Sequence, residues 1–387
     1  MDKRERSKMN LRKVFTSESV SEGHPDKLCD QISDAILDAC LKQDPYSRVA
    51  CECYVTTNHL IIGGEITTKA KIDYRAIARQ VMTDIGYTNK KYGLDAKSCK
   101  IDVYVKQQSP DIARGVDALG AGDQGIMFGY ATDETKGYMP LPIVMAHKLV
   151  RVASQLRKNG EFKWARPDMK SQVSVDYTDP KHPKLLTVLM SIQHDPDYKK
   201  REFKKFIKEK IMIEVAKSFH MNTDFKVEIN PTGKFVIGGP KGDVGLTGRK
   251  IIVDTYGGSA RHGGGAFSGK DCTKVDRSGA YMARYIAKNV VAAGLASRCE
   301  VQLAYIIGKA DPVSVMIDTY QTNRIPEEKI LQAILETFPL KPQEIIEILD
   351  LRKPQFQQLA SYGHIGRHDI AVRWEDLDQV EKLKKYL

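Results

Sequence analysis

The sequence predicts an α+β fold that consists of three similar helix and β-hairpin units arranged about a pseudo-threefold axis. Two observations support this prediction. A pattern of helix, hairpin and helix recurs three times at a spacing of about 110–140 residues, and glycine-rich connectors lie between the copies at 115–129, 233–248 and 257–269. Because a repeat of this length is too long for a solenoid, each copy should form a domain-sized unit.

The first copy opens with an amphipathic helix, because Leu28, Ile32, Ile36 and Cys40 recur at helical spacing. Alternating apolar and polar residues then predict two strands, and Ser109-Pro110-Asp111 ends the copy. The predicted elements are a helix over 25–42, strands over 48–56 and 59–67, a helix near 71–86 and a strand over 100–106.

The other two copies repeat this order. The predicted elements of the second copy are a helix over 142–158, strands over 171–178 and 184–194, a helix over 199–218 and a strand over 225–230. Those of the third copy are a helix over 276–296, strands over 299–307 and 312–320, and a helix over 326–338, with no clear final strand. The chain therefore divides into a basic tail 1–13, α+β units over 14–111, 124–240 and 241–387, and a polar loop over 112–123. This loop is either an active-site lid or an ordinary connection, and we predict a lid.

Composition places the chain among soluble globular proteins, because 42% of its 387 residues are hydrophobic and 28% are charged. No apolar run reaches the roughly 18 residues that a membrane span needs, and the N-terminal segment is basic and polar. We therefore expect a cytoplasmic protein without a membrane partner. The seven cysteines are odd in number and form no C-x-x-C pair, which argues against disulfides and a zinc site.

The formal net charge of +11 suggests a polyanionic partner, either a nucleic acid or a small molecule. Much of the excess lies in the two tails and between residues 199 and 210, and such runs are usually solvated faces. We therefore expect a small polyanion and no nucleic acid.

Residues 263–271 come within one residue of a phosphate-binding P-loop. Gly264, Gly269 and Lys270 fit the motif, but Asp271 stands where Ser or Thr should hold Mg²⁺. A carboxylate there would repel phosphate unless it faced away or held a metal. The segment is therefore either a chance match or a phosphate site of another design, and no role for Asp271 follows from the sequence.

A second segment suited to phosphate is Gly23-His24-Pro25-Asp26-Lys27, which precedes the first helix. A helix N-terminus favours anions, His24 and Lys27 can contact a phosphate oxygen, and Asp26 can bind Mg²⁺. The alternative is helix capping with a surface histidine.

Between residues 234 and 276, many cations and a few acids lie among about ten glycines. This composition suits a metal-bound polyphosphate, because Arg and Lys neutralise oxygens while Asp binds Mg²⁺. No Ser-His-Asp or Cys-His pattern predicts a covalent intermediate. His364 and His368 could form a metal pair, but local packing explains two histidines without a suitably spaced acid better.

Taken together, these segments resemble the S-adenosylmethionine synthetase (methionine adenosyltransferase) family. The resemblance covers nearly the whole chain outside the basic tails. Its motifs follow the family's order and occupy residues 15–27, 120–125, 166–172, 230–233, 263–271 and 360–367.

The resemblance implies three α+β units and an enzyme in which the methionine sulfur attacks the ribose 5′ carbon of ATP. Triphosphate leaves and is then hydrolysed to pyrophosphate and phosphate. A thioether is a neutral nucleophile that needs no base, so positioning and preorganised positive charge should carry catalysis. The family also implies two Mg²⁺ ions per active site, K⁺, and a homotetramer of two dimers whose active sites are shared across each dimer.

Matching motifs also imply the roles of single residues. The catalytic residues would be His24, Lys170, Arg249 and Lys270. The ATP-binding residues would be His24, Asp168, Lys170, Lys234, Phe235, Asp243, Arg249, Lys250, Ala266 and Lys270, and the methionine-binding residues Glu65, Gln108, Asp243 and Lys274. Asp26 and Asp276 would bind Mg²⁺, and Glu52 would bind K⁺.

The chain departs from the family pattern at two places. The spacer between Gly115 and Gly120 is shorter than in many bacterial relatives, so the reach of their lid does not transfer to this chain. Lys234 stands where relatives often have Arg, which keeps the charge but loses bidentate geometry.

Two other functions fit parts of the sequence. A P-loop NTPase would have a parallel sheet whose strand ends directly in the glycine loop, whereas the strand predicted over 250–254 is separated from Gly264 by a polar stretch. A nucleic-acid-binding protein would use the charge of +11 and bind with strong salt dependence.

Overall fold

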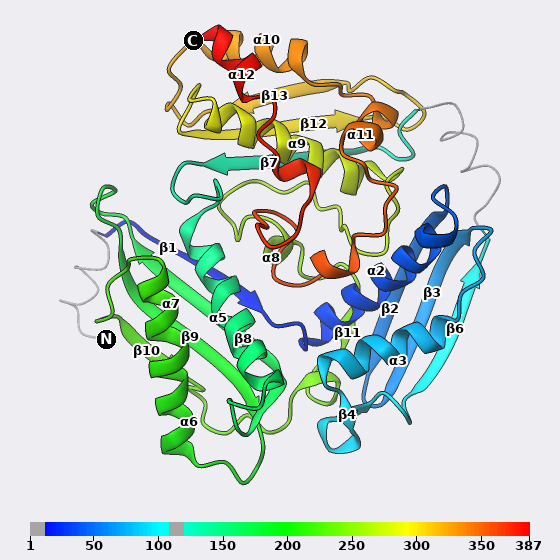
Figure 1. Ribbon diagram of the computed structural model, residues 1–387, viewed down its shortest axis with the longest axis vertical. Helices are drawn as coiled ribbons and strands as arrows, with labels where there is room; N and C mark the ends of the chain where they lie inside the picture. The colour runs from blue at the N-terminus through cyan, green and yellow to red at the C-terminus, as the bar shows by residue number, and fades with distance from the viewer. Residues whose placement is uncertain (1–11, 108–119) are drawn as a thin grey trace.

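Three units surround a central region that contains the short helix α8 (Ile251–Asp254), as the computed structural model shows (Figure 1). Each unit is a β-sheet with helices packed on one face. The structure describes residues 12–107 and 120–387. Gln108, most of the predicted lid and most of the basic N-terminal tail lie outside these ranges.

The first sheet has the strand order β11-β2-β3-β6 and is covered by α2 and α3. Its elements are α2 (Pro25–Gln43), β2 (Arg48–Thr56), β3 (His59–Thr67), α3 (Tyr74–Ile85), β6 (Lys100–Lys106) and β11 (Gly245–Leu246), with a small ladder of β4 (Thr88–Asn89) and β5 (Leu94–Asp95) beside them.

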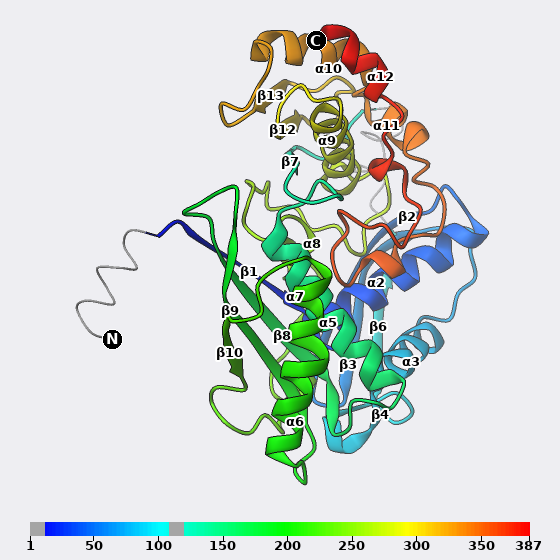
Figure 2. The ribbon, with the colours of Figure 1, turned by 60° about the vertical axis from the view of Figure 1, so that its left-hand side comes forward.

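The second sheet has the order β1-β8-β9-β10. Its elements are β1 (Val14–Val20), α5 (Leu141–Lys158), β8 (Ala165–Asp176), β9 (Lys184–His194), α6 (Lys200–Phe206), the π-helical turn η2 (Ile207–Met212), α7 (Ile213–Ser218) and β10 (Lys226–Ile229). Figure 2 shows α5, α6 and α7 together on one face of this sheet.

The third sheet has the order β13-β12-β7. Its elements are β7 (Gly125–Thr132), α9 (Val275–Ala292), β12 (Arg298–Tyr305), β13 (Ser314–Asp318) and α10 (Glu327–Thr337), followed by α11 (Pro342–Ile348) and α12 (Val380–Leu383).

All three sheets share one layout, which explains the repeat in the sequence. In each sheet, an edge strand pairs antiparallel with the first strand of a hairpin: β11 with β2, β1 with β8, and β7 with β12. In the first two sheets, a helix then crosses over to a last strand that lies parallel to the second hairpin strand. Within the described residues, the third sheet has no such last strand.

Most predicted elements are confirmed. The strands predicted over 48–56, 59–67, 100–106 and 184–194 have these bounds in the structure, and every predicted helix starts within three residues of its observed start. The strand predicted over 250–254 is wrong, because residues 251–254 form helix α8. The strand predicted from residue 171 begins earlier, at Ala165.

The sheets do not follow the predicted contiguous ranges. β1 lies in the range of the first unit but pairs in the second sheet, and β7 lies in the range of the second unit but pairs in the third. β11, from the range of the third unit, completes the first sheet. Strand pairing depends on distant partners, so local patterns cannot assign it. The domain boundaries themselves stay a prediction.

The first sheet has one buried face and one open face. On β2, the alternate residues Val49, Cys51, Cys53 and Val55 are buried in the core. The exposed residues Glu52 on β2, Glu65 on β3 and Tyr104 on β6 lie on the opposite face. No helix in the described residues is both long and apolar enough to cross a membrane.

Candidate active site

The N-terminus of α2 carries a buried, neutral histidine. His24 is the N-cap residue, and its Nδ1 accepts a hydrogen bond of 3.2 Å from the backbone N–H of Asp26. Burial, followed by the positive charge of Lys250, lowers the pKa of His24 to about 3. Both sequence interpretations therefore hold in part, since His24 caps the helix but its side chain is only 2% exposed.

Asp26 holds a cation-bearing loop beside this helix terminus. Its Oδ1 accepts a hydrogen bond of 2.9 Å from the N–H of Leu246, and its Oδ2 lies 2.5 Å from Nζ of Lys250. Lys250 is thus held next to His24, whose pKa responds to it. The helix terminus therefore brings a neutral donor, a carboxylate and a cation together.

Lys27 does not join this group, contrary to the sequence interpretation. Its side chain is fully buried and contacts Asp30 at 2.9 Å and also Asp254. Burial opposes the charged form of Lys27, but Asp254 and Asp30 raise its pKa above the usual value. Lys27 is therefore a core cation that cannot contact a bound phosphate.

A second buried carboxylate, Asp168 on β8, lies near the same loops. Its Oδ2 accepts a hydrogen bond of 2.9 Å from the N–H of Gly239, whereas its buried Oδ1 has no hydrogen-bond partner in the described residues. Burial raises the pKa of Asp168 to about 6, against the lowering effect of the Gly239 bond. The free oxygen can accept a hydrogen bond from a ligand.

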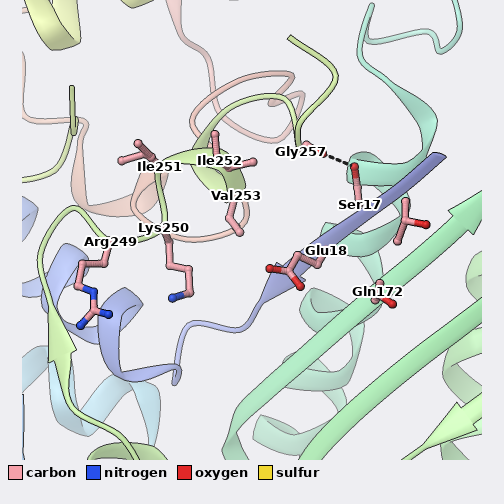
Figure 3. A pocket seen from close by; sticks show the side chains of 10 residues that line it. Ser17, Glu18, Gln172, Arg249, Lys250, Ile251, Ile252, Val253 and Gly257 are labelled. Carbon is pink, nitrogen blue, oxygen red and sulfur yellow. Dashed lines mark hydrogen bonds between the residues drawn. The ribbon is translucent and has the colours of Figure 1, made fainter. Parts of the chain in front are cut away.

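A pocket of about 360 Å³ lies between β1, β8 and α8, and Lys250 and Glu18 point into it from opposite sides (Figure 3). Ser17 closes one side with a hydrogen bond of 2.7 Å to the carbonyl oxygen of Gly257. The lining residues are Thr16, Ser17, Glu18, Gln172, Arg249, Lys250, Ile251, Ile252, Val253 and Gly257. Two predicted ATP-binding cations, Arg249 and Lys250, therefore border one cavity.

The P-loop-like segment lies along the edge of β2 as a short extra strand. Cys51 N–H donates to Gly269 at 2.9 Å, Asp271 N–H donates to Val49 at 3.1 Å, and Lys270 pairs antiparallel with Ala50. Residues directly opposite each other in a sheet project to the same face. Since Ala50 in turn pairs with Glu65, the side chains of Lys270 and Glu65 both project from the open face of the first sheet.

Asp271, which breaks the P-loop motif, has a structural role. Its side chain is fully buried and accepts hydrogen bonds from Val49 N–H at 2.7 Å and Thr273 N–H at 3.0 Å. Lys274 lies 2.5 Å from the same carboxylate. The carboxylate therefore faces the core and attaches the loop to β2. It does not project from the open face of the sheet, as the Lys270 side chain does.

The predicted site residues thus form two groups. The first, around the start of α2 and β8, includes His24, Asp26, Asp168, Lys170, Arg249 and Lys250. The second, on the open face of the first sheet and the start of α9, includes Glu52, Glu65, Lys270, Lys274 and Asp276. No hydrogen bond or ion pair between described residues joins side chains of the two groups.

The other predicted residues lie in the connecting loops. Phe235 exchanges hydrogen bonds with His194, its N–H donating to Nε2 at 3.0 Å. Lys234 and Asp243 are exposed, and Ala266 is half-buried. His364 is buried against Tyr281, whose hydroxyl lies 2.8 Å from its Nδ1. The described residues contain no group of three or more His, Cys, Asp or Glu that could hold a metal.

Sequence reasoning missed a row of aspartates along α2. Asp26, Asp30, Asp34 and Asp38 follow one another at intervals of four residues, so they lie on one face of the helix. All four accept hydrogen bonds from backbone N–H groups of distant loops. Four acids at this spacing in a helix that is otherwise largely buried are the signal that could have revealed them.

Comparison with known proteins identifies the family. Residues 12–110, 118–235 and 237–376 match the N-terminal, central and C-terminal domains of S-adenosylmethionine synthetase. The chain belongs to the S-adenosylmethionine synthetase family. An S-adenosylmethionine synthase of Mesoplasma florum is 63% identical over 379 residues, which cover 97% of this chain and 100% of that protein. Those of Mycoplasma capricolum and Mycoplasma mycoides are each 60% identical and cover 97% of both chains.

Family membership and geometry both argue against the P-loop NTPase alternative. Helix α8 precedes the glycine loop where that fold needs a strand, and each sheet contains antiparallel pairs. The pseudo-threefold α+β architecture is that of the synthetase family.

The neutral state of His24 predicts how kcat/KM depends on pH. Since its pKa is about 3, His24 is uncharged throughout the range from about pH 6 to pH 8, and kcat/KM for ATP should show no inflection that depends on it. His24→Asn should lower kcat/KM but leave the shape of the profile unchanged. An inflection near neutral pH that disappears in His24→Asn would contradict this assignment.

Proposed function

We propose that the chain forms S-adenosylmethionine, as its relatives are named for doing, and that its substrates are ATP and methionine. The observation that carries this proposal is two fixed cations, one beside a neutral helix cap and one on an open sheet face. Asp26 holds Lys250 beside His24, and pairing with β2 fixes Lys270 on an open sheet face. The sequence has no Ser-His-Asp or Cys-His pattern that predicts a covalent intermediate, which suits a reaction whose main demand is expulsion of a charged leaving group.

The reaction forms one bond and breaks another at the ribose 5′ carbon, and each change moves one electron pair. The methionine sulfur donates a lone pair to form the new sulfur–carbon bond. The carbon–oxygen bond to the triphosphate breaks, and its electrons stay on the triphosphate oxygen. Because the thioether carries no proton to remove, no base is required, and the cations lower the barrier by stabilising the negative charge of the leaving group. Water then cleaves triphosphate into pyrophosphate and phosphate.

His24 is assigned to the oxygen at the breaking bond. Its buried ring is neutral, so it donates a hydrogen bond without bringing a charge that burial would penalise. Lys170, Arg249 and Lys270 are assigned as the other catalytic residues. Lys250, Lys234, Phe235, Asp243 and Ala266 are assigned to ATP, and Asp168 offers its unpartnered Oδ1 to a donor group of the nucleotide.

Mg²⁺ is assigned to Asp26 and Asp276. Each carboxylate is paired with a lysine, Asp26 with Lys250 at 2.5 Å and Asp276 with Lys270 at 2.6 Å. Such a site fits an ion that takes one or two carboxylates and completes its shell with phosphate oxygens and water. The ions would neutralise the triphosphate. Glu52, exposed on β2, would supply one oxygen ligand to K⁺.

Methionine is assigned in part to residues of the second group. Glu65 lies on the open face in the same row as Lys270, and its carboxylate can receive the methionine ammonium group. Lys274 and Asp243 complete the assignment, together with Gln108, which lies outside the described residues.

A second copy of the chain is proposed to complete each active site. Among the described residues, no hydrogen bond or ion pair joins side chains of the first and second groups, and the second group includes residues on the open face of the first sheet. Suppose that the open face of the first sheet in one copy packs against the start of α2 and β8 in another copy. The second group of one chain then meets the first group of its partner, and a twofold axis repeats this arrangement at a second site. The association of two such dimers into a tetramer and a cytoplasmic location stay predictions.

The test of this function is direct. Purified protein incubated with ATP, methionine, Mg²⁺ and K⁺ should form S-adenosylmethionine, pyrophosphate and phosphate in equal amounts. Omission of methionine should stop nearly all ATP consumption. Hydrolysis of ATP without methionine, and no S-adenosylmethionine with it, would overturn the proposal.

Lys270→Ala should slow the chemical step far more than it weakens methionine binding. Loss of one preorganised cation at the leaving group costs on the order of 10²–10³ in rate. Single-turnover formation of S-adenosylmethionine measures this step, and Lys205→Ala, which removes an exposed lysine of α6, is the matched control. An unchanged single-turnover rate in Lys270→Ala would refute the role.

A further inference from the structure

Helix α2 presents a row of four carboxylates to loops that are distant in sequence. Asp26 accepts from Leu246 N–H at 2.9 Å, and Asp30 accepts from Gly248 N–H at 2.8 Å. Asp34 accepts from Gly269 N–H at 2.8 Å. Asp38 accepts from the N–H groups of residues 355–357 at 2.9–3.0 Å. The first three therefore hold the two loops that carry the proposed catalytic cations Arg249 and Lys270.

Asp34 forms an ion pair with a buried arginine that also hydrogen-bonds to the same loop. Arg277 donates to both carboxylate oxygens of Asp34, at 2.7 and 2.9 Å, and both side chains are fully buried. The other terminal nitrogen of Arg277 donates to the carbonyl oxygen of Lys270 at 2.8 Å. The pair thus bonds the N–H of residue 269 and the carbonyl of residue 270, on either side of the Lys270 α-carbon.

The loop that carries Lys270 lies so close to the backbone of β2 that residue 269 must be a glycine. Gly269 has a φ of +81°, and a Cβ there would lie 1.9 Å from the carbonyl oxygen of Cys51. The edge pairing with β2 sets the direction in which Lys270 projects, and the Asp34–Arg277 pair fixes the peptide groups around it.

We propose that Asp34, together with Arg277, is a positioning residue that sets the location of the Lys270 ammonium group for triphosphate expulsion. This rests on the proposed function. Neither side chain is accessible to a ligand, and both reach the loop through the backbone of residues 269 and 270. Asp38 belongs to the same row and is half-buried, but it holds residues 355–357, which carry no proposed catalytic group.

The experiment compares Asp34→Asn with Asp38→Asn. Both changes remove a charge from the same face of α2, and both should lower the thermal midpoint. Asp34→Asn should also lower the single-turnover rate by on the order of 10², because a displacement of about 1 Å at a catalytic group costs that much. Asp38→Asn should leave this rate within about twofold of the wild-type rate at a temperature where both variants are folded.

A double-mutant cycle separates positioning from general loss of structure. If Asp34 acts through Lys270, Asp34→Asn should have little further effect on the rate once Lys270 is Ala. Additive rate losses in Asp34→Asn/Lys270→Ala, or equal rate losses in the two aspartate variants, would overturn the proposal. Wild-type protein that forms no S-adenosylmethionine would overturn the proposed function instead.

Arg277→Lys gives an independent route to the same test if Asp34→Asn does not fold. Lysine keeps the positive charge next to Asp34 but cannot donate to both Asp34 oxygens and the Lys270 carbonyl in the same geometry. Its rate loss should again vanish in the Lys270→Ala background, and additive losses would again contradict the assignment.

Discussion

The row of aspartates on α2 is the constraint on which the rest of the site depends. A helix rises about 1.5 Å per residue, so Asp26 and Asp34 lie about 12 Å apart along its axis. The loop that carries Lys250 is attached at the first position and the loop that carries Lys270 at the third. A single rigid element therefore sets the separation between the two groups of candidate site residues, although the loops themselves contain many glycines.

Burying these carboxylates has a large cost, which buried cations and backbone donors offset. Lys27 pairs with Asp30, and Arg277 pairs with Asp34, all with fully buried side chains. Breaking one partner of such a pair costs about 3–5 kcal/mol, since a charge is left unpaired in the interior. The ion pairs that neutralise these buried carboxylates thus also hold the loops that carry Arg249 and Lys270. Stability and site geometry therefore depend on the same residues.

Local patterns in the sequence predict the parts of this fold that local interactions determine. The alternation in 48–56 and 59–67 predicted β2 and β3, and helical spacing in 25–42 predicted α2. The exchange of β1, β7 and β11 between sheets was not predictable, because edge pairing depends on partners more than a hundred residues away. Asp271 had no derivable role for the same reason, since its main partner, Val49, lies 222 residues earlier.

The central claim is that each active site combines the first group of residues from one chain with the second group from another. Co-expression of His24→Ala and Lys270→Ala chains in equal amounts tests it. Each variant alone should be nearly inactive. Random pairing in a twofold-symmetric dimer leaves about a quarter of all sites with both groups intact, so the mixture should regain about a quarter of wild-type S-adenosylmethionine formation. A mixture no more active than the two variants measured separately would contradict the claim.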